Sequence, residues 1–318
     1  MYDKESGLVT VFGGGGFIGR YVCECLFKTG VRVRVAARHP RRAFFLQPLA
    51  AVGQLDLVQA DLRIPRSVAA AVEGASAVVN LVGVLTGDFE ALQADGAGTV
   101  AEEAARLGAS ALVHVSAIGA DPASESRYGV SKGEGEARAR SAFPTATIIR
   151  PSLVFGPEDQ LTNRFATLMS RLPVYPVIAP RTRFQPVYVR DVAQAIAAAA
   201  LDPGKHGGRT YEIAGPEVMT MRQLTEYIAD ASGQSPGLFD LPDPVANAIS
   251  HLGFLPGAPL TRDQWLMLSR DNVASQQVAG LDGFGITPTP LSAVAPDWLA
   301  RFRHGGRFAA PREYSSVG

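Results

Sequence analysis

The chain has 318 residues, 47% of them hydrophobic and 19% charged, which is enough apolar material for one large or two moderate globular domains. Its 30 basic and 30 acidic residues cancel, so the composition gives no sign of a protein that binds nucleic acid. The longest apolar run, near residues 196–201, is far shorter than a membrane span, so we expect a soluble protein without a transmembrane segment.

The N-terminal residues and the cysteines indicate the compartment. Residues 1–6 are polar and lead directly into an apolar run, so we expect no signal peptide and a cytoplasmic location. The two cysteines, Cys23 and Cys25, would point in different directions on a helix. We therefore expect free thiols in a reducing compartment. The five histidines are scattered, and no spacing typical of a metal site is present.

A glycine-rich stretch near the N-terminus has the context of a dinucleotide-binding turn. Residues 8–12 read as a buried strand, and a helical pattern begins directly after the glycines. In the spacing GxxGxxG, the first glycine permits the tight turn, the second lets backbone approach a pyrophosphate, and the third lets helix and strand pack closely. The start of the helix offers backbone N–H groups to the phosphates. The predicted cofactor-binding residues here are Gly13, Gly16, Phe17, Ile18 and Gly19.

The end of the second predicted strand indicates which dinucleotide binds. Residues 31–35 alternate as a strand, and no acidic residue follows to bind a ribose 2′-hydroxyl. Arg38, Arg41 and Arg42 follow instead, and arginine accommodates a 2′-phosphate. We therefore favour NADP(H) over NAD(H), with Arg38 and Arg42 as ligands. The alternative interpretation is a solvated basic turn.

The next segments alternate between strands and helices with short loops. Strands are expected at residues 55–60, 77–83 and 111–116, and this order predicts an α/β, doubly wound parallel sheet, a Rossmann fold. Asp61 and Leu62 would lie at the adenine edge, and a second glycine turn at Leu81, Val82 and Gly83 is also assigned to the cofactor. His114 lies inside an apolar strand and is expected in the core.

The domain prediction divides the chain after residue 160. Residues 6–160 are expected to form the dinucleotide-binding domain. Residues 161–318 are expected to form a mixed region, of which about 183–202 complete the sheet and the rest form a smaller, discontinuous substrate lobe and a basic tail. The apolar stripe Val245, Ile249 and Leu252 would pack against the main domain or contact a membrane-bound partner. The tail at 301–307 would dock on a partner or an acidic lipid surface.

A second motif follows the fifth predicted strand, which ends at Ser116. Tyr128 and Lys132 are four residues apart and would share one face of a helix. An ammonium group near a phenol lowers the phenol's pKa, which gives a proton donor or acceptor usable near neutral pH. The same lysine can hold the nicotinamide ribose.

Together with residues 149–157 (IRPSLVFGP) and 185–193 (QPVYVRDVA), these motifs resemble an extended short-chain dehydrogenase/reductase along nearly the whole chain. The resemblance implies that Tyr128 is the acid/base, that Lys132 modifies its pKa and that Ser116 binds a carbonyl. It also places Pro151 in the loop on the nicotinamide side of the cofactor.

Other stretches resemble an atypical branch, the nucleotide-binding accessory subunits of respiratory complex I and their bacterial relatives. They are residues 12–20, 114–121, 155–160, 163–165, 183–189, 260–264 and 271–273. The resemblance implies partners among complex I subunits and a position peripheral to the inner membrane.

Three departures bear on catalysis. Active extended members usually carry a second hydroxyl after the serine of the fifth strand, whereas Ser116 is followed by Ala117 and stands one residue too early. An asparagine common early in the long helix is Asp95 here. The helix of Tyr128 and Lys132 contains three glycines, and each glycine in a helix interior costs on the order of 1 kcal/mol of stability. Alternatively, these glycines admit close approach of the cofactor or of a neighbouring helix. They are Gly129, Gly133 and Gly135.

Two functions follow from these observations and stay open at this point. The first is an NADP(H)-binding component with little turnover, serving in a respiratory NADH:quinone oxidoreductase or in its assembly. The second is an active NADP-dependent oxidoreductase that acts on a carbonyl or alcohol of a small-molecule substrate through Tyr128 and Lys132.

Overall fold

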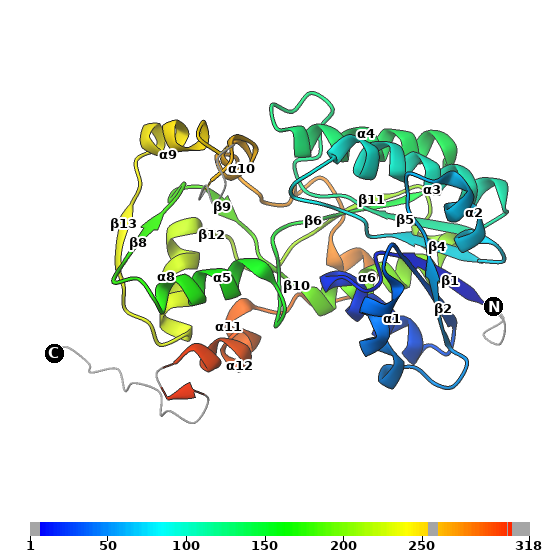
Figure 1. Cartoon of the computed structure of the whole chain (residues 1–318), viewed down its shortest axis with the longest axis horizontal. Helices are drawn as coiled ribbons and strands as arrows, with labels where there is room; N and C mark the ends of the chain where they lie inside the picture. The colour runs from blue at the N-terminus through cyan, green and yellow to red at the C-terminus, as the bar shows by residue number, and fades with distance from the viewer. Residues whose placement is uncertain (1–6, 254–259, 304, 307–318) are drawn as a thin grey trace. The chain divides into compact units, whose positions relative to one another are not determined.

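The computed structural model describes residues 7–253, 260–303 and 305–306, which form two compact units (Figure 1). Unit 1 contains the described parts of residues 1–152, 189–214 and 274–288, and unit 2 contains those of residues 153–188, 215–273 and 289–318. The first boundary therefore lies at residue 152 rather than at 160, and the chain returns twice to unit 1.

Unit 1 is built on a seven-stranded sheet with the order β11-β6-β5-β4-β1-β2-β3, in which all neighbouring strands run parallel. This confirms the predicted Rossmann-type α/β fold. The central strands are rich in valine, as a sheet covered on both faces requires. Their bounds are β1 (Leu8–Phe12), β2 (Arg32–Ala37), β3 (Leu55–Gln59), β4 (Ala77–Asn80), β5 (Ala111–Val115), β6 (Thr147–Pro151) and β11 (Thr210–Ile213).

The seventh strand differs from the prediction. Residues 183–202 do not add a strand to this sheet; they contain β9 (Arg183–Phe184) and β10 (Val187–Tyr188) of unit 2 and helix α6 (Val189–Leu201) of unit 1. The added strand is β11, which pairs with β6.

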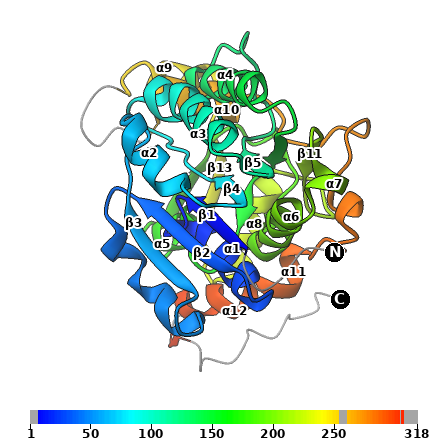
Figure 2. The same ribbon diagram turned by 90° about the vertical axis from the view of Figure 1, so that its right-hand side faces the viewer.

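Helices cover both faces of the sheet (Figure 2). Helices α2 (Pro65–Val72), α3 (Asp95–Arg106) and α4 (Arg127–Ala142) share one apolar core with β4, β5 and β6. Helices α1 (Phe17–Lys28) and α6 pack together against the other face. The remaining elements of unit 1 are η1 (Pro40–Leu49), η2 (Glu90–Ala94), α7 (Pro203–His206) and η3 (Leu281–Phe284).

Unit 2 combines short strand pairs with helices. Its strands pair as β7 with β10, β9 with β12 and β8 with β13. Its core includes Trp298, and a smaller cluster includes Trp265, so both tryptophans are core residues. The other strands of unit 2 are β7 (Val154–Phe155), β8 (Val174–Val177), β12 (Met219–Thr220) and β13 (Gly237–Asp240). Its helices are α5 (Gln160–Met169), α8 (Met221–Ala231), α9 (Asp243–Ser250), α10 (Arg262–Leu268), α11 (Leu291–Val294), α12 (Pro296–Leu299) and η4 (Ala300–Phe302).

The predicted stripe Val245, Ile249 and Leu252 begins on α9 and is only partly buried, since Ile249 is half-buried. Ala246 and Ser250 are the buried residues of this helix, whereas Val245 and Leu252 are exposed. Of the predicted basic tail, residues 304 and 307 lie outside the described residues.

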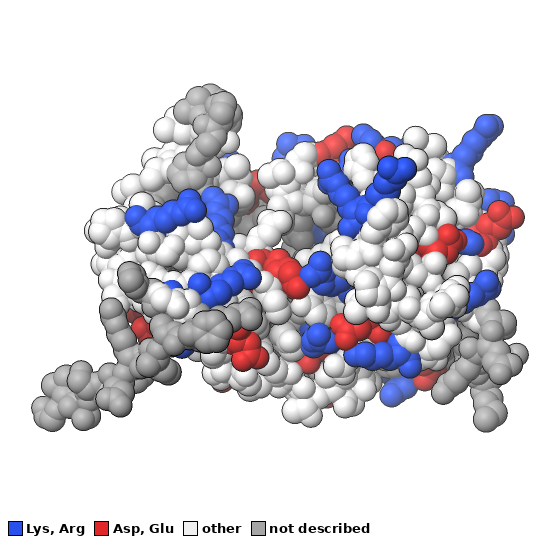
Figure 3. All heavy atoms as spheres, turned by 60° about the horizontal axis from the view of Figure 1, so that its bottom comes forward, with Lys and Arg blue, Asp and Glu red and all other residues white. Residues whose placement is uncertain are grey.

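Within the described residues, no helix has both the length and the apolar character that crossing a membrane requires. The same residues hold no cluster of three metal-ligating side chains. On the face that Figure 3 presents, basic and acidic side chains are interspersed.

Candidate dinucleotide site

The glycine turn after β1 is closed in the way that its spacing predicts. Gly13 has a φ of +81°, which favours glycine. A Cβ on Gly19 would overlap the carbonyl oxygen of Gly13 and the backbone of Gly14, so the helix lies directly on the turn. Among the described residues other than its chain neighbours, a Cβ on Gly16 would meet only Gly13 O within 4 Å, at 3.1 Å. Gly16 therefore leaves one side of the turn open, as close approach of a pyrophosphate requires.

Helix α1 begins at this turn with its N-terminal groups available. Gly16 is the N-cap residue and offers no side chain, and the first turn, which contains Phe17 and Ile18, holds no acidic residue. The first-turn N–H groups of a helix have no intrahelical partner, and this end of the helix dipole is positive. An anion such as a phosphate fits this arrangement.

The arginines predicted to bind a 2′-phosphate lie beyond β2, beside the glycine turn. Arg38, Arg41 and Arg42 are all exposed. The segment that carries them is held in place because Ala43 packs on Gly15, where an added Cβ would lie 3.1 Å away. The guanidinium of Arg20 also lies 4.4 Å from the centre of the Phe45 ring.

The side chain of Asp61, after β3, is bound to a neighbour. Its carboxylate accepts hydrogen bonds from Arg63 at 2.5 and 2.9 Å. The hydrogen bonds from Arg63 lower the pKa of Asp61 to about 2, and the charge of Arg38 contributes in the same direction. Leu62 is buried and packs beside Gly96 of α3.

The loop that leaves β4 is fixed from two sides. The Leu81 N–H donates to the Phe12 carbonyl, and the Val82 N–H donates to the Asn80 side chain at 3.1 Å. Gly83 lies beside Lys132, whose Nζ would be 3.2 Å from a Cβ on this glycine. The structure thus brings the second glycine turn and the lysine of α4 together.

Lys132 is deeply buried, with 3% of its surface exposed. Its Nζ donates a hydrogen bond to the Val115 carbonyl at 3.1 Å. Burial lowers the pKa of Lys132 to about 8, and the charge of Glu136 opposes that shift. A lysine with this pKa is still largely charged at pH 7.

Tyr128 does not behave as predicted. Its side chain is half-buried, and its ring meets that of Phe89 edge-on at 6.2 Å. Burial raises the pKa of Tyr128 to about 12, so the expected lowering by Lys132 is absent. Desolvation is the cause of this shift. Such a phenol keeps its proton at neutral pH and can act only as an acid there.

Ser116 continues the β5 ladder and is buried, with 4% exposed. Its N–H donates to the Ile149 carbonyl at 2.7 Å, and its Oγ has no hydrogen-bond partner among the described residues. His114, two residues earlier and on the same face, is 1% exposed, which confirms a core position. Burial lowers the pKa of His114 to about 3. Pro151 ends β6, buried, and its carbonyl accepts from the Ile118 N–H at 3.1 Å.

Gln93 belongs to the candidate site but is not among the predicted residues. It is 1% exposed and lies in the π-helical turn η2. Its Oε1 accepts from the Val84 N–H at 3.3 Å, and its Nε2 donates to Ser131 Oγ at 3.1 Å, which ties the loop after β4 to α4. The residue singled out instead, Asp95, is exposed and paired with Arg138.

The glycines of α4 are positions of close packing. A Cβ on Gly129 would lie 2.6 Å from Ser124 Oγ, and one on Gly133 would lie 2.5 Å from Pro122 N. A Cβ on Gly135 would overlap the Gln93 carbonyl. They let a loop and a neighbouring helix approach, and they fix α4 rather than loosen it.

Known proteins share this sequence pattern and fold. Residues 9–214 match the NAD dependent epimerase/dehydratase family. The chain is 33% identical over 96% of its length to the NADH dehydrogenase [ubiquinone] 1 alpha subcomplex subunit 9, mitochondrial, of Arabidopsis thaliana, and covers 80% of that protein. It is 34% identical over 95% of its length to the protein of that name in Mus musculus, and covers 82% of it.

Two further proteins are reductases by name. A ceramide reductase of Caulobacter vibrioides is 31% identical over 77% of this chain and 76% of its own length. The Escherichia coli NADPH-dependent quinone oxidoreductase complexed with NADPH has the same fold, with a TM-score of 0.74 at 22% identity over 92% of this chain and 99% of that one. With the parallel sheet and the glycine turn, these matches lead to one conclusion: the chain belongs to the NAD dependent epimerase/dehydratase family of extended short-chain dehydrogenases/reductases, in the branch that contains complex I alpha subcomplex subunit 9.

Proposed function

We propose that this chain is an NADP(H)-binding accessory or assembly component of a respiratory NADH:ubiquinone oxidoreductase, with little turnover of its own. The observation that carries the proposal is the likeness to alpha subcomplex subunit 9, at 33% and 34% identity over 96% and 95% of the chain. The likeness extends over both units rather than over the dinucleotide-binding motifs alone. Its place would be peripheral to the inner membrane, among complex I subunits.

Three features support NADP(H) as the bound dinucleotide. The N-terminus of α1 is uncapped and faces an open glycine turn. No acidic residue follows β2, and Arg38 and Arg42 are exposed in the segment beside the turn. The buried ammonium group of Lys132 would hold the nicotinamide ribose and adds a positive charge for the anionic cofactor.

Two features support low turnover. Active extended members carry two successive hydroxyl residues after the fifth strand. This chain has Ser116, which is 4% exposed, and then Ala117, which has no hydroxyl. Tyr128 has a pKa raised to about 12, so it is a weak acid. Tight binding of NADP(H) would still stabilise the folded chain, because a ligand that binds the folded state shifts the unfolding equilibrium.

The test combines purification with affinity capture. We expect the tagged chain, expressed in its own cells, to retain NADPH through gel filtration and to capture complex I subunits from solubilised membranes. Purified protein should leave the NADPH unoxidised in the presence of carbonyl compounds and quinones. A chain that binds no dinucleotide, or that captures no complex I subunit, would contradict the proposal.

A second function is favoured by one relative and by one motif. The relative is the ceramide reductase of Caulobacter vibrioides, and the motif is the intact pair Tyr128 and Lys132. In this function, hydride from NADPH would pass to a carbonyl carbon while Tyr128 gives its proton to the oxygen, which yields an alcohol and NADP⁺. Turnover that Tyr128→Phe abolishes without loss of NADPH binding would establish this function and reject the first.

A further inference from the structure

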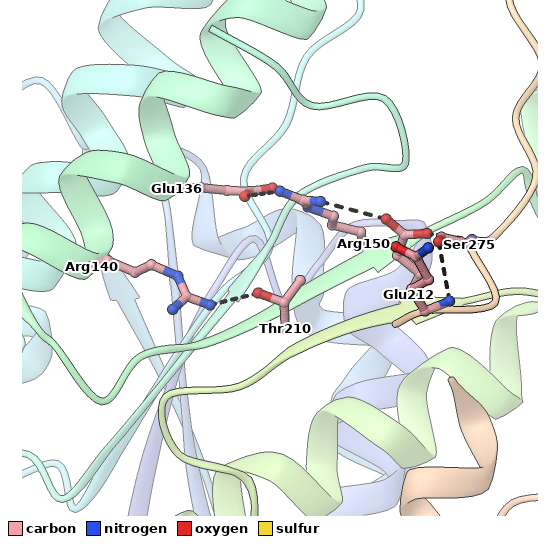
Figure 4. A network of polar contacts seen from close by, with 7 residues as sticks. Glu136, Arg140, Arg150, Thr210, Glu212 and Ser275 are labelled. Carbon is pink, nitrogen blue, oxygen red and sulfur yellow. Dashed lines mark hydrogen bonds and ion pairs between the residues drawn. The ribbon is translucent and has the colours of Figure 1, made fainter. Parts of the chain in front are cut away.

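A polar stripe runs along the face of α4 that covers the sheet. Lys132, Glu136 and Arg140 follow one another at intervals of four residues, so they share one face of the helix. The sheet contributes Arg150 on β6 and Glu212 on β11, which are partners in the strand register. Figure 4 shows Glu136 and Glu212 on either side of Arg150.

The contacts of Arg150 fix both carboxylates. Its Nε and Nη2 donate to the two oxygens of Glu136 at 2.9 and 2.7 Å, and its Nη1 lies 3.5 Å from Glu212 Oε1. Glu212 Oε2 accepts from the Ser275 N–H at 2.7 Å. Glu136 is 7% exposed and Glu212 8%. The Glu136 carboxylate therefore has a defined position in a medium that screens charge poorly.

The buried carboxylates of Glu136 and Glu212 share one guanidinium, that of Arg150, so these three side chains together carry a net charge of minus one. Lys132 lies one helical turn from Glu136, is 3% exposed, and donates to an uncharged carbonyl group. Among the described residues, no carboxylate forms a direct ion pair with Lys132. A buried ammonium group without a counter-charge is costly, and the network supplies that charge.

We propose that Glu136 is the counter-ion that keeps Lys132 protonated, and that Arg150 and Glu212 position it for that task. One consequence rests on the proposed function: dinucleotide binding through Lys132 should depend on Glu136. Glu136 acts through Lys132 and is a positioning residue. Its effect on Lys132 exists without any cofactor and can be measured without one.

The other groups facing Lys132 leave Glu136 as the source of negative charge. His114, from β5, has its pKa lowered to about 3 and is neutral at pH 7. Gln93, from η2, is uncharged, and Tyr128, one turn earlier on α4, keeps its proton because its pKa is raised to about 12. Among the described residues, Glu136 is the one carboxylate whose charge acts on the pKa of Lys132, and it raises that pKa.

The experiment measures the titration of Lys132 directly. The chain has four lysines, Lys4, Lys28, Lys132 and Lys205, so ¹³Cε-lysine labelling of the full chain gives few signals. Lys132→Met assigns the signal of Lys132. We expect a titration midpoint of about 8 in the wild type, and a midpoint lower by about one pH unit in Glu136→Gln.

Two variants separate a specific effect from a general one. Arg140→Gln removes a charge from the same stripe, where Arg140 bonds Thr210, and should leave the Lys132 midpoint within a few tenths of a pH unit. Glu136→Gln with Arg150→Met removes one charge of each sign, which keeps the fold free of an unpaired guanidinium. Because the charge of Glu136 acts on the pKa of Lys132, whereas no effect of Arg150 is found, the double variant should still titrate below the wild type. An unchanged midpoint in both Glu136 variants would overturn the proposal.

The same proteins then test the link to the dinucleotide. The upper pH limit of NADPH binding should move down with the Lys132 midpoint in Glu136→Gln and stay in place in Arg140→Gln. A shifted midpoint in a chain whose wild type binds no NADPH would reject the proposed function and leave the counter-ion role intact. An unshifted midpoint in a chain that binds NADPH would reject the counter-ion role and leave the proposed function intact.

Discussion

Gly135 of helix α4 faces the backbone carbonyl of Gln93 so closely that a methyl group on the glycine would overlap the oxygen. Both partners are buried, and a backbone oxygen cannot move away as a long side chain can. We therefore expect Gly135→Ala to lower the free energy of unfolding by about 1–3 kcal/mol, measured by denaturant titration.

Gly204 provides the matched control for this substitution. It lies in α7, and a Cβ there would meet one side-chain oxygen at 3.7 Å, an ordinary contact. Gly204→Ala should leave the free energy of unfolding unchanged or raise it by up to about 1 kcal/mol. Equal losses of unfolding free energy in the two variants would show that close packing on Gln93 is not the reason for a glycine at position 135.

The two glycines at the start of α1 should separate folding from binding. Gly19→Ala forces a Cβ into the backbone of the turn and should destabilise the chain. Gly16→Ala meets one oxygen at 3.1 Å and should fold nearly as the wild type does. It should nevertheless weaken NADPH binding about tenfold, since its Cβ occupies the side from which a pyrophosphate approaches. Calorimetry gives both quantities, and unaltered NADPH binding in Gly16→Ala would remove this turn from the site.

The arginines after β2 should set the preference for the 2′-phosphate. A hydrogen bond to a charged group contributes about 1.5–3 kcal/mol, so Arg38→Ala or Arg42→Ala should weaken NADPH about tenfold or more while NADH binding stays nearly constant. Arg41→Ala is the control for the loss of a basic charge from the same exposed segment. If all three variants lose NADPH and NADH binding alike, the preference has another source.

Buried His114 should make the chain sensitive to acid. Its pKa is lowered to about 3 in the folded state, so below its ordinary pKa near 6.5 the unfolded chain binds one more proton. The contribution of this group is complete above pH 6.5 and is lost as the pH falls toward 3, at roughly 1.4 kcal/mol per pH unit. His114→Asn should flatten the decline in the free energy of unfolding over that window by the same slope. An identical slope in the two proteins would refute a buried neutral imidazole.

The two thiols should differ in reactivity. Both cysteines are free; Cys23 is fully buried with a pKa raised to about 12, whereas Cys25 is half-buried with a pKa raised by burial to a smaller extent. The thiolate is the reactive form, so the folded protein should consume one equivalent of a thiol reagent, slowly. Cys25→Ser should abolish that reaction, and denaturant should release the second thiol. Rapid loss of two equivalents from the folded chain would disagree with this packing.

The first five strands and the glycine turn could be predicted because their signals are local. Apolar runs of four to six residues separated by helical patterns give a parallel sheet wherever a crossover helix joins them. The residues of the turn could be assigned because each glycine meets a steric requirement set by residues close in the sequence. Exposure of the arginines after β2 follows from the same local pattern.

Other features depend on contacts distant in the sequence. The seventh strand is β11, and the residues that form it give no sign that they pair with β6. Gln93 escaped notice because a π-helical turn rotates the helix, so Gln93 rather than Asp95 points inward. The pKa of Tyr128 was predicted in the wrong direction, because the spacing to Lys132 shows a neighbouring charge but not how much water both groups lose.

The assembly of unit 1 from three stretches of chain has a consequence for synthesis on the ribosome. The sheet lacks its seventh strand until Thr210–Ile213 has been made, and the segment that binds Glu212 through Ser275 comes later still. Until then β6 is an unpaired sheet edge, and such edges recruit other chains. A nascent chain halted at residue 160 would be a candidate for chaperone binding, although it already contains every glycine of the dinucleotide turn.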